Sequence, residues 1–113
     1  MTADFTPIRL ACSHGPDLHF EGKLVHEYST QNKGRTKDRW TELRLWETPA
    51  GNWVAESVGM SSRNGEGVIR EARVIKVGEG SERVGAVMEA FGWTTAAKAF
   101  ARDMGWQVTV RVE

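Results

Sequence analysis

The hydrophobic residues of this chain change their spacing close to Ser81. Before that position, apolar residues alternate with polar ones in short runs, which is the pattern of half-buried β-strands. After it they recur every three to four residues, which is the pattern of amphipathic helices. The switch predicts a sheet-forming part followed by a helical part. It constrains the fold, but it identifies no reaction.

The sheet-forming part contains five strand-like segments separated by turn or loop sequences. They are Ile8–Cys12, Phe20–Thr30, Trp40–Thr48, Trp53–Met60 and Val68–Val77. Pro49–Asn52 is a turn sequence, so the third and fourth segments are expected to form an antiparallel hairpin. Strict alternation in the second segment would place five side chains on one face: Phe20, Gly22, Leu24, His26 and Tyr28.

Two short helices are expected after Ser81, which is a good residue to cap the first of them. The first helix has an apolar stripe of Val84, Val87, Met88 and Phe91, and the second has one of Ala97, Phe100, Ala101 and Met104. Gly92 and Gly105 fit the two C-terminal caps, and Thr94 or Thr95 fits the second N-terminal cap. Trp106 is expected to fold back on the last turn, and Trp106–Val112 alternates like a final strand.

These elements predict the α+β class in one domain, residues 1–113. The expected architecture is an antiparallel meander of four to five strands, with two short C-terminal helices packed on one face and a final strand. Neither helix can bury its apolar stripe alone, so both are expected to lie across the sheet.

Charge and cysteine content narrow the function classes. Fifteen basic and fifteen acidic residues give no net charge, so the field that usually marks a nucleic-acid or membrane-surface binder is missing. The single cysteine excludes an intramolecular disulfide. No secretory signal or membrane-spanning run is recognisable. We expect a cytoplasmic protein without a membrane partner.

Catalytic, cofactor and metal signals are weak. Cys12, His14 and His19 are the metal candidates, because a short hairpin would make the two histidines cross-strand partners with the thiol on the same face. Their spacing matches no known zinc module, so a solvated hairpin tip is the favoured interpretation. Among the carboxylates only Glu56 stands in an apolar run, between Val54 and Val58. We expect a non-enzymatic protein that needs no cofactor.

A basic loop next to aromatic residues is the strongest candidate for a binding site. The candidate residues are Lys33, Arg35, Lys37, Arg39, Trp40, Arg44 and Trp46. Trp40, Arg44 and Trp46 alternate with Leu43 and Leu45, so they are expected to face away from the core. The favoured function is the binding of a protein partner through this face, and a homodimer through the same face is a variant. The alternative is single-stranded nucleic acid, with phosphates on the basic groups and bases stacked on the indoles.

The stretch RWTELRLWETPAGNWVAESVG, from Arg39 to Gly59, resembles small uncharacterised bacterial proteins often carried by phages or plasmids. In these, a tryptophan-led strand, a glycine turn and a second strand precede a short helical tail. The resemblance covers about half of the chain and carries no functional residues with it. It implies a mobile-element setting, in which compact non-enzymatic proteins inhibit host machinery, CRISPR effectors included.

Overall fold

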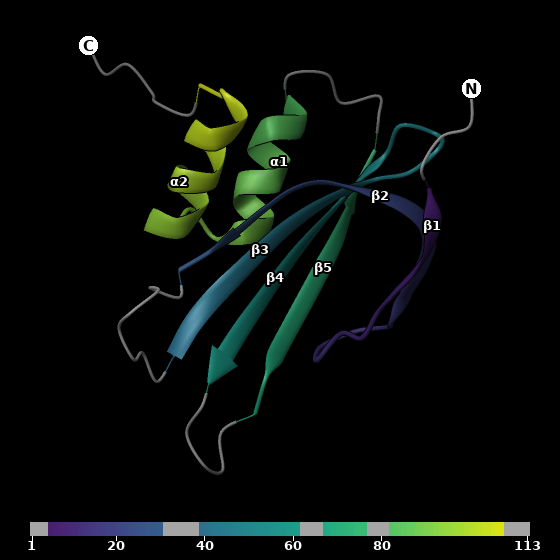
Figure 1. The fold of residues 1–113 in the computed structure, drawn as a ribbon, viewed down its shortest axis with the longest axis horizontal. Coiled ribbons are helices and arrows are strands. Elements are labelled where there is room, and N and C mark those ends of the chain that lie inside the picture. The colour runs from purple at the N-terminus through teal and green to yellow at the C-terminus, as the bar shows by residue number, and fades with distance from the viewer. Residues whose placement is uncertain (1–4, 31–38, 62–66, 77–81, 108–113) are drawn as a thin grey trace.

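The computed structural model describes residues 5–30, 39–61, 67–76 and 82–107. A curled antiparallel sheet of five strands, in the order β1-β2-β3-β4-β5, is followed by two helices (Figure 1). The elements are β1 (Thr6–Leu10), β2 (Leu18–Ser29), β3 (Arg39–Glu47), β4 (Trp53–Ser61), β5 (Ile69–Ile75), α1 (Glu82–Phe91) and α2 (Thr95–Met104). The predicted α+β meander with C-terminal helices is confirmed. The expected cap Ser81 and the expected final strand from residue 108 onward lie outside the described residues.

The main core lies between the helices and one face of the sheet. Leu43, Leu45 and Ile75 enter it from the strands. Most of both predicted helical stripes enters it from the helices, namely Val87, Met88, Phe91, Ala97, Phe100 and Ala101. Phe100 is fully buried and contacts Phe91 edge-on, with 5.2 Å between the ring centroids. Burial of these stripes supplies the stability that two ten-residue helices lack on their own.

Both caps of α2 and the glycine at the end of α1 form as the sequence predicts. The Thr94 hydroxyl accepts a hydrogen bond from the amide of Ala97. Gly92 and Gly105 both adopt positive φ, which glycine tolerates without a Cβ clash. Trp106 folds back on α2: its amide donates to the carbonyl of Ala101, and its ring stacks on Trp53 at 5.5 Å.

A bulge in β2 corrects the expected arrangement of that strand. Leu24 pairs with Trp46, but His26 pairs with Leu45, so Val25 is an extra residue in the ladder. The extra residue reverses the alternation. Phe20, Gly22 and Leu24 therefore share the face of Trp46, whereas His26 and Tyr28 share the helix-covered face with Leu45 and Leu43. The expectation of one common face for all five side chains is wrong.

The bulge lets the β1–β2 hairpin curl away from the flat part of the sheet, so that its tip reaches the far edge (Figure 1). The tip spans residues 11–17. Ser13 donates its amide to the carbonyl of Arg70 on β5 at 2.7 Å, and the Ser13 hydroxyl accepts from the Arg70 amide at 2.9 Å. A contact between the β1–β2 hairpin tip and the last strand thus holds the sheet in its curled shape.

At Gly22, neighbouring side chains leave no room for a Cβ atom. A Cβ at this position would stand 2.5 Å from the Phe20 ring and 3.2 Å from Ile8. Gly22→Ala should therefore displace Phe20 and destabilise the fold by about 1–3 kcal/mol.

Gly85→Ala is the matched control, since nothing lies within 4 Å of its Cβ position in α1. This variant should instead stabilise the protein by about 0.5–1 kcal/mol, because alanine favours the helix. Urea unfolding of both variants measures the two effects. Equal effects of the same sign would contradict this account of Gly22.

Candidate partner-binding site

The predicted site residues divide into two groups in the structure. Lys33, Arg35 and Lys37 lie outside the described residues. Arg39, Trp40, Arg44 and Trp46 all lie on β3. The expected orientation of the last three is confirmed, since Leu43 and Leu45 pack under the helices and the alternate positions face the opposite side of the sheet.

Arg44 is held by three carboxylates from three strands. Its Nη2 lies 2.6 Å from Oε1 of Glu42, its Nε lies 3.2 Å from Oε2 of Glu27, and its Nη1 lies 3.7 Å from Oε1 of Glu56. Glu56 is only 4% exposed, in agreement with its apolar neighbours in the sequence. Arg44 is therefore the neutralising cation of an internal network.

Each of the two indoles on this face donates to one of the carboxylates that contact Arg44. Trp40 Nε1 donates to Oε2 of Glu42 at 3.0 Å, and Trp46 Nε1 donates to Oε1 of Glu56 at 3.1 Å. The Trp46 ring also meets Phe20 edge-on at 6.3 Å. Trp46 and Arg44 thus stabilise the curled sheet. Trp40 lines a cleft of about 500 Å³, and Arg44 lines a smaller one of about 280 Å³. Within the described parts of the chain, every buried polar side-chain atom has a hydrogen-bond partner.

The network shifts two ionisation equilibria. The indole hydrogen bond of Trp40 does most to lower the pKa of Glu42; partial burial opposes it, and the contact with Arg44 lowers the pKa further. Burial alone would lower the pKa of Arg44, but the hydrogen bond and charges of Glu42 and Glu56 outweigh burial and raise it. Both groups are therefore held in their charged forms.

Glu42 should give the protein an acid-sensitive stability. Its pKa in the folded state is below the ordinary value of 4.5, so the unfolded chain binds the proton more readily. The stabilisation is present above pH 4.5 and is lost as the pH falls through the lower folded-state pKa. Glu42→Gln should therefore be less stable than the wild type at pH 7, with a difference that shrinks in acid. Urea unfolding across this range measures it, and parallel pH profiles would contradict it.

β3, β4 and β5 extend past the helices at one end of the sheet (Figure 1). The residues of these strands that line a cleft of about 500 Å³ lie at that end. We call it the end cleft; its walls are Thr30, Arg39, Trp40, Thr41, Gly59, Met60, Ser61, Gly67 and Ile69. Thr41, Gly59 and Ile69 are cross-strand neighbours in one row, so the missing side chain of Gly59 leaves a hollow between them. Ile69 is 53% exposed and forms an apolar wall. Sequence patterns missed this hollow, because it depends on which residues flank Gly59 across the sheet.

The three metal candidates do not come together as expected. His19 pairs with Arg9 across the hairpin, whereas His14 lies in the seven-residue tip and contacts Glu71 of β5 at 3.6 Å. The predicted cross-strand pair of His14 and His19 is wrong, because the tip is longer than a tight turn. Cys12 Sγ lies 3.9 Å from the carbonyl of Leu10. Within the described ranges, no three His, Cys, Asp or Glu residues gather in a way that could hold a metal ion.

Comparisons of the chain with protein-family models, with curated proteins and with solved structures found no match. The resemblance to phage- and plasmid-borne proteins therefore stays a prediction. In the described part of the chain, neither helix has the length and apolar character that a membrane crossing requires.

Proposed function

We propose that this protein is a non-catalytic binding protein whose end cleft receives an apolar side chain from an acidic segment of a protein partner. The observation that carries the proposal is the hollow at Gly59, open to solvent beside the exposed Ile69. Small-residue hollows with apolar walls are the sites that buried anchor residues of a partner fill. Inhibition of host machinery, as the resemblance implies, would be one use of such a contact.

The acidic character of the partner follows from the charges around the cleft. Thr30 and Arg39 line it, and the segment that joins them carries Lys33, Arg35 and Lys37. The described residues that flank this basic segment, Thr30 and Arg39, thus lie at the cleft. A basic segment that begins and ends next to an apolar hollow would favour acidic partners and speed their association.

Protein is favoured over single-stranded nucleic acid because of how Trp40 is held. Its indole is bound to the carboxylate of Glu42, which is kept in its charged form. A carboxylate beside the stacking ring repels the phosphates of a bound strand. The ring therefore suits an apolar or neutral contact better than a nucleotide.

The test uses short acidic peptides with one central leucine, compared with the same peptides carrying serine at the centre or lysine in place of the acidic residues. We expect the leucine peptides alone to bind, as measured by tryptophan fluorescence and by heat of binding. Gly59→Leu should abolish binding, since its side chain would occupy the hollow and its Cβ meets only ordinary contacts at 3.8–3.9 Å from Ile69.

Ile69→Ser should weaken the binding by about tenfold or more, because it removes an apolar wall. The matched control is Val25→Ser, which changes an exposed apolar residue on the β2 bulge, and should leave affinity unchanged. Peptide binding that is indifferent to Gly59→Leu would overturn the proposal. Salt-sensitive quenching by a single-stranded oligonucleotide, lost in a Lys33/Arg35/Lys37 triple alanine variant, would favour nucleic acid instead.

A further inference from the structure

β5 is an edge strand with an incompletely covered outer side. β4 pairs with its inner side along its whole length. Among the described residues, the hydrogen bonds on its outer side are those between Ser13 and Arg70. Glu71, Arg73 and Val74 are exposed. A strand edge of this kind is a template for another strand unless something blocks it.

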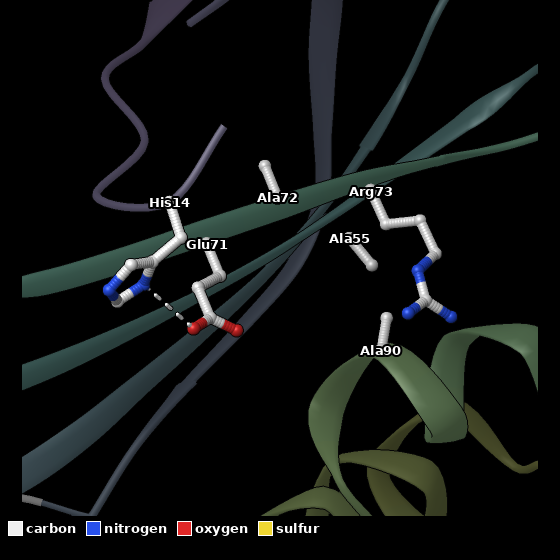
Figure 2. Close-up of a pocket in the computed structure, with 6 residues that line it drawn as sticks. All are labelled: His14, Ala55, Glu71, Ala72, Arg73 and Ala90. Atoms are coloured by element: carbon white, nitrogen blue, oxygen red, sulfur yellow. Dashed lines mark ion pairs between the residues drawn. The ribbon is translucent and has the colours of Figure 1, made fainter. Parts of the chain in front are cut away.

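The hairpin tip covers part of this edge, because Ser13 makes the two hydrogen bonds to Arg70 that a residue of a neighbouring strand would make. Ser13 gives Arg70 both a donor and an acceptor, as an antiparallel neighbour would. Because main-chain groups alternate in direction along a strand, Ala72 and Val74 direct theirs outward like Arg70. His14, next in the tip, pairs with Glu71 at 3.6 Å over the same edge (Figure 2).

The side chains of β5 are complementary to those of a second β5 in one antiparallel register. If a two-fold axis passes through Ala72, Glu71 of each copy stands opposite Arg73 of the other. Both residues share the face that bears Ala55, because Glu71 pairs with Ser57 and Arg73 with Ala55. Opposite charges in directly facing positions stabilise strand pairing. The next symmetric register, centred on Arg73, would instead oppose two arginines.

We propose that β5 pairs with β5 of a second copy in the register centred on Ala72, and that the hairpin tip competes with this pairing. The second copy would replace each contact that the tip makes. Val74 of that copy would take both main-chain hydrogen bonds of Arg70 in place of Ser13, and its Arg73 would pair with Glu71 in place of His14. The tip thus sets the balance between monomer and dimer.

Charge reversal tests the register. The apparent mass of the wild type should rise with concentration in sedimentation equilibrium. Glu71→Arg and Arg73→Glu should each weaken the dimer, because like charges would then face each other twice. The double variant Glu71→Arg/Arg73→Glu restores opposite charges and should restore the dimer. Association that ignores the single reversals would overturn the proposal and would place the contact on another surface.

Weakening the tip tests the competition. Ser13→Ala removes the hydroxyl that accepts from the Arg70 amide, and His14→Ala removes the contact with Glu71. Neither substitution limits the backbone conformations of the tip. The Ser13→Ala/His14→Ala variant should dimerise about tenfold more tightly, since it loses one hydrogen bond and the contact between His14 and Glu71 only from the monomer.

Two controls accompany this measurement. Circular dichroism and urea unfolding establish that each variant is folded, and Ser29→Ala changes a serine of β2 that lies away from the tip. A variant that stays folded and remains monomeric at the highest soluble concentration would overturn the proposal. This outcome is independent of the peptide test at the end cleft, which involves none of the tip residues.

Discussion

Phe100→Ala is expected to lower the free energy of unfolding by about 3–5 kcal/mol, the largest stability loss that we predict for a single substitution in this chain. Phe100 is fully buried at the centre of the helix-side core. Its ring meets His26 of β2 at 4.9 Å, Phe91 of α1 at 5.2 Å and Trp106 at 6.0 Å. Truncation removes a ring that contacts α1 and the sheet at once, and it leaves a cavity that the neighbouring rings only partly fill.

Thermal and urea unfolding followed by circular dichroism measure this loss, and the thermal midpoint should fall by more than about 10 °C. Lys98→Ala is the matched control, because it removes an exposed side chain from the same helix and should change stability by less than about 0.5 kcal/mol. An unchanged urea midpoint for Phe100→Ala would show that the helices contribute little to the cooperative core.

The sequence allows prediction of those parts of the fold that depend on neighbours along the chain. The β3–β4 hairpin follows from alternation on both sides of Pro49–Asn52, and Trp46 indeed pairs with Val54. The orientation of Trp40 and Trp46 follows from the same alternation. Residues of one strand have fixed relative directions, so local pattern suffices.

The curl of the sheet, in contrast, could not be predicted from neighbours along the chain. The pair Leu24–Val25 interrupts the alternation of β2 and is the local signal for the bulge, but the signal does not say how far the strand bends. The contact of Ser13 with Arg70 joins residues 57 positions apart, and no pattern in either segment encodes it. Long-range closure depends on the summed twist of all five strands.

The candidate site was predictable in part for the same reasons. Once the hairpin register is fixed, Arg44 stands directly opposite Glu56, so the ion pair follows from local sequence. The end cleft does not follow from local sequence. It arises where Gly59 stands between Thr41 and Ile69 and where the helices stop short of the strand ends. Those two conditions come from separate parts of the chain, and only the assembled structure combines them.

The network around Arg44 leads to the second large effect. Arg44→Met should destabilise the protein by about 3 kcal/mol at pH 7, because it leaves the buried carboxylate of Glu56 without its cation. The remaining hydrogen bond from Trp46 does not neutralise the charge. Glu42 and Glu27 would also lose their contacts with Arg44, so three carboxylates on one sheet face would lose the cation between them.

Glu56→Gln should cost less, about 1 kcal/mol, because the amide oxygen still accepts the hydrogen bond from Trp46 while the buried charge is removed. The double variant Arg44→Met/Glu56→Gln should then be more stable than Arg44→Met alone, since it no longer contains an unpaired buried carboxylate. Urea unfolding of the four proteins at pH 7 gives the coupling free energy. Strictly additive losses would mean that water reaches Glu56 well enough to stabilise its charge, and that Arg44 acts through packing and its contacts with Glu27 and Glu42.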